Sequence, residues 1–508
     1  MDWLLIIVLL PLFAAAAVVF MPGSQRRMIR GITLGASGLL LLCALIAFCT
    51  FKVGSGLQFE TKFVWVESLG LHFHLAADGI NIGIILMGAI ISFAAACCAD
   101  DITHRVKEFH VLLNLMIGGI LGTFASMDLF FFYFFHELAL VPTFIMIGVW
   151  GRGANRNYAT YKITLYLSLG ALLALIGLIG VYVQTETGAV SFSIPDLIAT
   201  VQESPIDESS QLWIFPLLMF GFGILVSLWP FHTWAPLGYG AAPTATAMLH
   251  AGVLKKFGLY GIIRVAIPMA PVGAQSWLGV LAWLALANLL FCGLVAVRQK
   301  DLNLLIGNSS VAHMGFIFLG IASLNVIGLT GAVLVMIAHG LLAALAFGLS
   351  GHLYRQTGSL DMRRMGGLLR QMPLAGSALL MVLLAGCGLP GFANFAGEVT
   401  IFFGAWAAGL KVVTVIAAWS ALVIGGLYMM RAIRNILHGP RGDDWAKASD
   451  VSPLIATALG LLLAALLVFG FAPWLLTEGI KGEVTKSVLL PKPSGVAGQI
   501  QTTEVAGR

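Results

Sequence analysis

Long apolar runs constrain this chain more than any other feature of its sequence. Fourteen hydrophobic segments lie between residues 3 and 475, most of them close to or above the roughly 20 residues that a helix needs to cross a bilayer. They are 3–21, 31–51, 80–99, 109–127, 129–150, 159–183, 212–230, 241–263, 275–297, 302–323, 326–349, 374–407, 412–430 and 452–475. Lipid offers the backbone no hydrogen-bond partners, so such runs must fold as helices. The sequence predicts an all-α polytopic membrane protein with about 14 transmembrane helices.

Composition excludes several other classes of protein. Hydrophobic residues make up 59% of the chain and charged residues 10%, against about 25% charged residues in an ordinary soluble domain. A soluble enzyme and a nucleic-acid binder are therefore excluded, and the continuous runs exclude a transmembrane β-barrel. The six cysteines show no C-x₂-C spacing, and no nucleotide or haem motif is present. We expect no cofactor and no metal in this chain.

Two of the segments contain helix breakers and suggest an internal repeat. Segment 7 runs into Trp229-Pro230, and segment 12 contains Gly388-Leu389-Pro390-Gly391. Because the broken segments are five apart, an odd number, we expect two inverted five-helix repeats, helices 4–8 and 9–13, with broken helices 7 and 12.

We expect a single membrane domain over 1–508. It divides into helices 1–3 (1–107), a first repeat (108–267), a second repeat (273–436), helix 14 (452–476) and a loose tail (477–508). The polar stretch 53–79 alternates in hydrophobicity and predicts a hairpin.

Basic residues predict the orientation of the chain. The odd-numbered loops and their immediate ends carry 18 Lys and Arg, whereas the even-numbered loops carry four. Positive charge collects on the cytoplasmic side of membrane proteins. We therefore expect a bacterial inner (plasma) membrane protein with both termini on the periplasmic side.

A few ionisable residues fall within the apolar segments. They are Glu137, His250, Lys255, Lys256, His313, His339 and Glu398. A charge at bilayer depth costs roughly 2.5–3.5 kcal/mol on insertion scales, so such residues usually line a path or pair with one another. An isolated histidine can instead serve packing alone, and Lys255 could extend its amine toward an interface. Acids, amines and imidazoles spread over several helices are what a proton relay requires.

Several motifs link these residues to one family. They are Asp78-Gly79-Ile80, His136-Glu137 with Leu140-Val141-Pro142, Pro230-Phe231-His232-Thr233-Trp234, Ala242-Pro243-Thr244, Tyr260-Gly261 to Arg264, Ser309-Ser310-Val311-Ala312-His313, Met336-Ile337-Ala338-His339-Gly340, Asp361 to Gly367, and Gly388-Leu389-Pro390-Gly391 to Glu398. With them the chain resembles the antiporter-like membrane subunits of proton-pumping NADH:quinone oxidoreductase (respiratory complex I), of the M type. The glutamate at 398, where other types have a lysine, favours the M type.

The resemblance implies a proton-translocating membrane-arm subunit that couples quinone reduction in partner subunits to proton transfer. NADH, FMN, iron–sulfur clusters and quinone would be bound by those partners. Expected partners are L- and N-type antiporter-like subunits, small membrane subunits and the lipid bilayer, with no nucleic acid. Residue by residue, Glu137 matches the helix-5 glutamate of the family and Lys256 the helix-8 lysine. His313 and His339 match the central histidines, and Glu398 matches the helix-12 glutamate.

The chain departs from the family pattern in its first half. Leu225 occupies the position of the helix-7 lysine that would partner Glu137. We expect the first half-channel to run through Glu137, Lys256 and His250 instead, with His136 as a candidate entry point for protons. One alternative is a subunit of a related membrane-bound hydrogenase or multi-subunit cation/proton antiporter. Another is a spacer subunit whose first half-channel is inactive.

Overall fold

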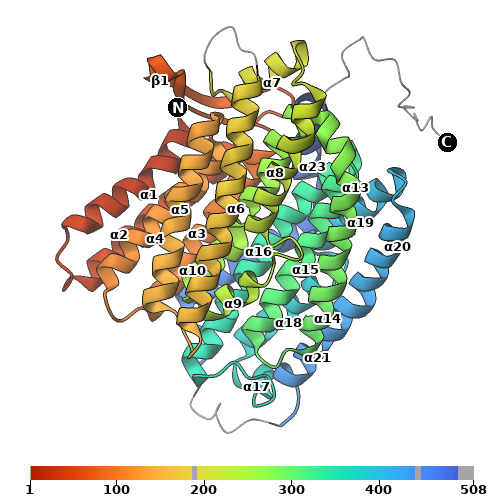
Figure 1. Cartoon of the computed structure of the whole chain (residues 1–508). Coiled ribbons are helices and arrows are strands. Elements are labelled where there is room, and N and C mark those ends of the chain that lie inside the picture. The colour runs from red at the N-terminus through yellow and green to blue at the C-terminus, as the bar shows by residue number, and fades with distance from the viewer. Residues whose placement is uncertain (1, 186–190, 441–447, 490–508) are drawn as a thin grey trace.

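Long helices run side by side through most of the chain, as the computed structural model shows (Figure 1). The structure describes residues 2–185, 191–440 and 448–489. Up to residue 269 its elements are α1 (Trp3–Phe20), α2 (Arg26–Thr50), β1 (Gln58–Val66), β2 (Leu71–Ala77), α3 (Asn81–Cys98), α4 (Val106–Ala125), α5 (Leu129–Trp150), α6 (Arg156–Gln184), α7 (Ile194–Glu203), α8 (Glu208–Val226), α9 (Trp234–Ala241), α10 (Thr244–Leu249), α11 (Lys256–Gly261) and α12 (Ile267–Met269).

The rest of the chain is equally helical. Its helices are α13 (Pro271–Ala287), α14 (Gly293–Arg298), α15 (Leu302–Ala322), α16 (Val326–Thr357), α17 (Leu368–Gln371), α18 (Pro373–Gly386), α19 (Ala393–Ala407), α20 (Lys411–Trp419), α21 (Gly426–Leu437), α22 (Pro453–Phe471) and α23 (Trp474–Glu483). In the described part of the chain, five π-helical turns interrupt or extend these helices, at His250–Leu254, Ile262–Ala266, Asn288–Cys292, Ser420–Gly425 and Val484–Val488.

The prediction of a polytopic helical membrane protein is confirmed. Within the described residues, twelve helices are long and apolar enough to cross a membrane. The two remaining predicted segments, 241–263 and 374–407, are helical but divided into shorter pieces by π-turns or by a break. A total of 14 spans remains a prediction, as does the inverted relation of the two repeats.

Both expected breaks are present. The helix α8 ends at Val226, and the chain reaches α9 through Ser227, which has a φ of 82°, and Pro230. The second break separates α18 from α19, where Gly388 and Gly391 adopt φ angles of 70° and 100°. Proline removes a backbone donor, and glycine tolerates a positive φ without steric cost, so these residues end the helices where they occur.

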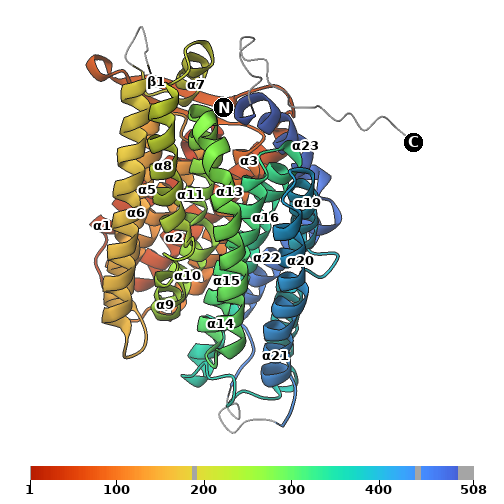
Figure 2. The same cartoon turned by 45° about the vertical axis from the view of Figure 1, so that its right-hand side comes forward.

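The centre of the bundle is formed by α15 and α16. Every residue in the most apolar 18-residue stretch of α16 is buried, and 94% of the corresponding stretch of α15 is buried, whereas only 33–39% of the corresponding stretches of α1, α2 and α22 is buried. In two views α16 lies between the α1–α6 side and the α20–α21 side (Figures 1 and 2). A polar side chain within these two stretches of α15 and α16 is therefore inside the protein and not against lipid.

The two ends of the bundle differ. The predicted hairpin is present as the antiparallel pair β1–β2, and it shares one end with α7 and α23, while α17 lies at the opposite end (Figures 1 and 2). The sequence did not predict α7.

The tail expected to be loose from residue 477 is helical as far as Val488, because Leu476, Ile480, Val484 and Val488 form one buried stripe. Residues 490–508 lie outside the described part of the chain.

The docking of α23 depends on a close backbone contact. A Cβ added to Gly79 would overlap the carbonyl oxygen of Gly479, so Gly79→Ala should push α23 away. Such overpacking costs about 1–3 kcal/mol, which makes the undocked state of α23 at least about fivefold more populated. We expect trypsin to cleave after the exposed Lys481 at least about fivefold faster in this variant. Gly482→Ala is the control, because no atom lies within 4 Å of its added Cβ; equal cleavage of both variants would contradict the contact.

Candidate functional site

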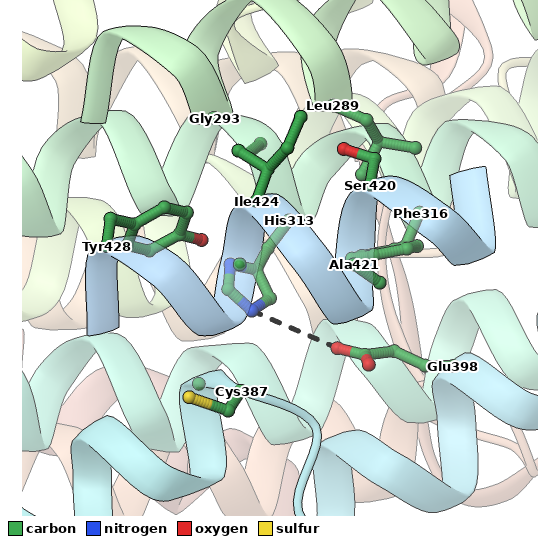
Figure 3. A pocket seen from close by; sticks show the side chains of 13 residues that line it. Leu289, Gly293, His313, Phe316, Cys387, Glu398, Ser420, Ala421, Ile424 and Tyr428 are labelled. Atoms are coloured by element: carbon green, nitrogen blue, oxygen red, sulfur yellow. Dashed lines mark ion pairs between the residues drawn. The ribbon is translucent and has the colours of Figure 1, made fainter. Parts of the chain in front are cut away.

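Four ionisable side chains form a line through the buried middle of the bundle. Lys256 Nζ lies 3.0 Å from His339 Nδ1, and the rings of His339 and His313 have centroids 5.5 Å apart. His313 Nε2 lies 3.9 Å from Glu398 Oε1 (Figure 3). We call these residues, from α11, α16, α15 and α19, the central line. Four of the six predicted site residues are thus brought together by the fold.

The hydrogen bonds fix how the two imidazoles are protonated when neutral. His313 Nδ1 lies 2.7 Å from the carbonyl oxygen of Ser309, which can only accept, so Nδ1 carries the proton and Nε2 is an acceptor. When Lys256 is charged it can only donate, so His339 Nδ1 accepts from it and the proton of the neutral imidazole is on Nε2. His339 therefore presents a donor nitrogen and His313 an acceptor nitrogen. A proton on Lys256 can pass to His339 Nδ1 while His339 releases its Nε2 proton.

The helix that carries Lys256 is irregular at this point. The π-turn His250–Leu254 precedes it and is closed by a bond from the Lys255 N–H to the His250 carbonyl, 3.1 Å. Lys256 Nζ donates to the carbonyl of Ala251 in that turn at 2.6 Å. π-Turns are frequent at functional sites because they alter the register of a helix and change its hydrogen-bond pattern. Here the turn supplies a neutral acceptor to a buried amine.

Glu398 ends the line beside a small cavity. The cavity has a volume of about 20 Å³, enough for a water molecule, and is lined by His313, Cys387, Glu398, Ser420 and Tyr428 among others (Figure 3). No described residue donates a hydrogen bond to Glu398 Oε1. Buried polar atoms of this kind are commonly bonded to ordered water.

The break before α19 lets the chain approach the carboxylate of Glu398. A Cβ on Gly388 would lie 2.8 Å from Glu398 Oε2, and Gly388 has a φ of 70°, so only glycine fits this position without strain. The other wall of the cavity is the π-turn Ser420–Gly425, whose Leu422 is 75% exposed on the outside. The cavity is therefore one helix away from the surface of the chain.

The residues expected to form the first half-channel are more dispersed. The side chain of Glu137 is 33% exposed, and its Oε1 lies 3.4 Å from His136 Nδ1. The ring of His136 stacks on Phe257 at 3.8 Å between centroids, next to Lys256 in sequence. No Lys or Arg of the described chain lies within ion-pair distance of Glu137.

His250 lies apart from this group. Its ring stacks on Trp234 at 5.6 Å and meets Tyr239 edge-on at 5.3 Å. Its Nδ1, the Tyr239 hydroxyl, the Thr246 hydroxyl and Asn303 Oδ1 are buried and have no hydrogen-bond partner among the described residues. Leu225, in the position of the family lysine, is buried at the end of α8.

A buried ion pair supports the hairpin end, and sequence reasoning did not single it out as a site. Arg264, in the π-turn Ile262–Ala266, binds Asp78 Oδ2 and also donates from Nε to Tyr260 at 3.1 Å. Asp78 Oδ1 accepts from the backbone at the start of α3. Burial and the negative charge of Asp78 raise the pKa of Glu483 at the end of α23. The signal for this pair was present, since both Asp78 and Arg264 flank apolar segments.

The described residues contain no group of three or more His, Cys, Asp or Glu side chains arranged to hold a metal ion. The site is instead a set of proton donors and acceptors enclosed by apolar helices.

Comparisons with known proteins agree on one family. A family model described as NADH:quinone oxidoreductase/Mrp antiporter, TM matches residues 126–425. NAD(P)H-quinone oxidoreductase chain 4 1 of Synechococcus sp. (strain JA-2-3B'a(2-13)) is 33% identical over 488 residues, which cover 94% of this chain and 90% of the relative. NADH-quinone oxidoreductase subunit M of Pseudomonas aeruginosa is 35% identical over 420 residues, which cover 80% of this chain and 81% of the relative.

Two solved structures share the fold of this chain. A chain of respiratory complex I from Thermus thermophilus with bound NADH superposes with a TM-score of 0.85 and 28% identity, covering 96% of this chain and all of that one. A chain of the Mrp complex from Dietzia sp. DQ12-45-1b has a TM-score of 0.81 at 20% identity, covering 96% and 97% of the two chains. The second likeness is one of fold alone.

The Asp78–Arg264 pair should dominate stability at the hairpin end. Asp78→Asn leaves the Arg264 guanidinium buried without its carboxylate, which costs about 3–5 kcal/mol. We expect a clear fall in the melting temperature of the detergent-solubilised protein. In the control, Asp361→Asn, the pair with Arg363 is partly exposed and worth less than about 1 kcal/mol. Equal melting temperatures for the two variants would show that the buried pair adds nothing.

Proposed function

The chain belongs to the NADH:quinone oxidoreductase/Mrp antiporter family of membrane subunits, and we propose that it carries protons across the membrane along the central line. Its relatives are named as M or chain 4 subunits of NADH-quinone and NAD(P)H-quinone oxidoreductases. In such an assembly this chain acts as a proton-translocating membrane-arm subunit, while NADH oxidation and quinone reduction take place in partner subunits.

The observation that carries the proposal is the continuity of the central line. Lys256, His339, His313 and Glu398 follow one another at 3.0 Å, 5.5 Å between rings and 3.9 Å. The 3.9 Å gap is too long for a hydrogen bond, and a side-chain movement or a water in the adjacent cavity closes it. Glu398 then holds the proton beside the cavity. Only the helix that contains the π-turn Ser420–Gly425 separates this carboxylate from the surface, and the proton leaves on that side.

Electrostatic interaction with a nearby charge can drive proton transfer along the central line. Two unit charges about 7 Å apart in a medium of effective dielectric about 20 interact by roughly 2.4 kcal/mol. That is nearly two pKa units, enough to change whether a buried amine holds its proton. Quinone reduction in the partner subunits supplies the energy by altering a charge near one end of the line.

Glu137 fits a position at a subunit boundary. It lies on the same face of α5 as Phe130, Phe134, Val141 and Ile145, all of which are exposed. A carboxylate in an exposed apolar stripe is costly in lipid, and a cation on a neighbouring membrane-arm subunit would compensate it. In this proposal Glu137 senses the state of that neighbour and passes the charge effect through His136 and Phe257 to Lys256.

The first half-channel has two candidate forms. One runs from Glu137 to Lys256 and His250, and the unpartnered hydroxyls of Tyr239 and Thr246 beside His250 favour it because they can hold ordered water. The other is an inactive half that serves as a spacer. The buried Leu225 and the absence of a described cation near Glu137 favour that form.

The orientation is part of the proposal. We place the hairpin, α7 and α23 on the periplasmic side of a bacterial inner membrane, because the basic loops lie at the opposite end of the bundle (Figure 1).

Replacing the terminal carboxylate tests the function. Glu398→Gln cannot bind or release a proton, so proton translocation and coupled quinone reduction should fall at least about tenfold, as expected when a positioned proton-transfer group is lost. The measurement uses membrane vesicles, with the complex purified through a tag on this chain to show that its NADH- and quinone-reactive partners remain bound. Glu478→Gln, on the exposed face of α23, is the control. Normal pumping by Glu398→Gln would refute the proposal.

Cysteine labelling tests the orientation. In a Cys49→Ser background, which removes the exposed native thiol, Thr485→Cys and Ser24→Cys place single exposed thiols at opposite ends of the bundle. A membrane-impermeant maleimide added to intact spheroplasts should label Thr485→Cys and leave Ser24→Cys unlabelled. The reverse pattern would invert the proposed orientation.

A further inference from the structure

Lys255 is a fully buried amine that the central line does not use. It is 1% exposed, and its Nζ donates to Ser310 Oγ at 2.7 Å and lies 3.4 Å from the Ser310 carbonyl. The same atom lies 5.4 Å from the centroid of the Tyr239 ring. The side chain therefore points toward α15 in the centre of the bundle. It does not extend toward a membrane interface.

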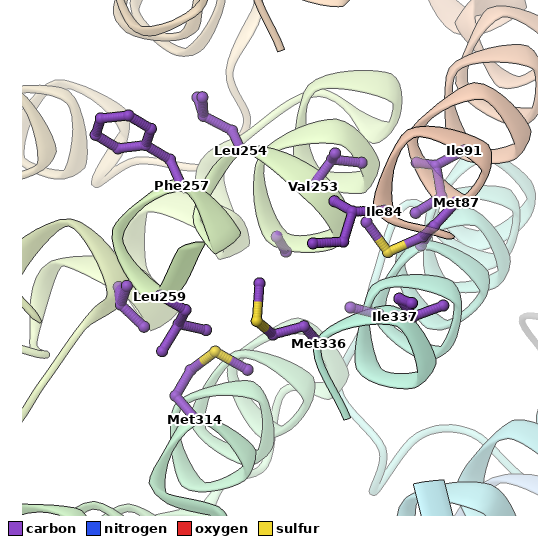
Figure 4. Packing of buried hydrophobic residues seen from close by; sticks show 14 of the residues in the cluster. Ile84, Met87, Ile91, Val253, Leu254, Phe257, Leu259, Met314, Met336 and Ile337 are labelled. Carbon is purple, nitrogen blue, oxygen red and sulfur yellow. The ribbon is translucent and has the colours of Figure 1, made fainter. Parts of the chain in front are cut away.

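The surroundings of Lys255 carry no compensating charge. No carboxylate of the described chain lies within 4 Å of its Nζ, and its hydrogen-bond partners are a hydroxyl and a carbonyl. Apolar side chains, among them Leu254, Leu259 and Met314, fill the space between the helical segment 250–261 and its neighbours α3, α15 and α16 (Figure 4). An uncompensated amine is costly in such an environment and indicates a functional role.

The segment that carries the two lysines is enclosed on every side, because all residues from 241 to 270 are buried. Successive side chains on a helix diverge by about 100°, so two neighbours on an enclosed helix contact different partners. Here Lys255 contacts Ser310 on α15, and Lys256 contacts His339 on α16. The helix lies between α15 and α16 and offers one amine to each of them.

The amines of two successive buried residues cannot both be charged at low cost. Like charges in a water-poor interior repel, and neighbouring groups that interact strongly titrate as a pair that shares a proton. Each amine has its own neutral acceptor, Ser310 Oγ for Lys255 and Ala251 O for Lys256, so a proton can be held on either. The pair therefore has two arrangements of one positive charge.

We propose that Lys255 is a second proton-carrying residue, which holds the shared proton while Lys256 is neutral. This inference rests on the proposed function and adds a residue to it. When the proton of Lys256 has passed through His339 and His313 to Glu398, the positive charge that opposes a proton on Lys255 has moved away, and the Lys255 amine binds the next proton that enters the bundle from the aqueous phase. That proton passes from Lys255 to the neutral Lys256 amine once the central line has released the previous one, so Lys255 supplies each new proton to Lys256.

The test separates proton transfer from anchoring. Lys255→Met removes the amine, and Lys255→Arg keeps the charge, the donors and the cation–π contact but does not release a proton. Both variants should lower proton translocation per quinone reduced, or the turnover, by about tenfold. Leu259→Met, a volume-conserving change on the same helix, is the matched control and should stay within about twofold. Wild-type rates in Lys255→Arg would show that Lys255 is only an anchor and overturn the proposal.

Two comparisons keep the outcomes distinct. If Glu398→Gln abolishes translocation while Lys255→Met does not, the inference fails and the proposed function stands. If neither variant has an effect, the proposed function itself fails. Should the Lys255 variants not assemble, Ser310→Ala removes the acceptor of Lys255 with little loss of volume. It should slow translocation several-fold, and an unchanged rate would contradict a role for Lys255.

Discussion

The cost of burying charge in an apolar interior governs the arrangement of this protein. Arg264 is compensated by Asp78, whereas Lys255 and Lys256 have only neutral acceptors, and Glu398 has an imidazole 3.9 Å away. The first arrangement is fixed because removing either partner leaves an uncompensated charge. The second arrangement, at Lys255, Lys256 and Glu398, can change its protonation state, because neutral neighbours allow each group to exist with or without a proton. Stability thus depends on the compensated pair, and proton transfer depends on the uncompensated residues.

Helix irregularities place these residues where they are needed. The π-turn His250–Leu254 supplies the carbonyl that accepts a hydrogen bond from Lys256, the π-turn Ile262–Ala266 carries Arg264, and the π-turn Ser420–Gly425 forms one wall of the cavity beside Glu398. The break at Gly388 brings the backbone close to the Glu398 carboxylate. Regular helices would satisfy the backbone in lipid equally well. The departures from regularity therefore coincide with the buried polar groups, as is common at functional sites.

The sequence predicted the helices and much of the candidate site, because long apolar runs and the rare ionisable residues within them are local signals. A glutamate, a lysine and two histidines within apolar runs identified Glu398, Lys256, His313 and His339, and the fold brings them together. The contact of Lys255 with Ser310 depends on how α15 packs against a distant segment of the chain, so the direction of its side chain could not be predicted. The exposure of Glu137 and the docking of α23 against Gly79 depend on contacts between distant segments, and the hydrophobic periodicity of a sequence does not predict such contacts. Residue types were predictable, and relative orientations were not.

The central claim is that a proton resides on Glu398 during turnover. Infrared difference spectroscopy of the complex, recorded between its resting and turnover states, measures this directly through the carbonyl stretching band of a protonated carboxylic acid. The account predicts a band that shifts in D₂O and is absent from the Glu398→Gln variant, because the carboxyl group gains or loses a proton beside His313. Identical difference spectra for the unsubstituted protein and the variant would contradict the account, since the protons would then follow another path.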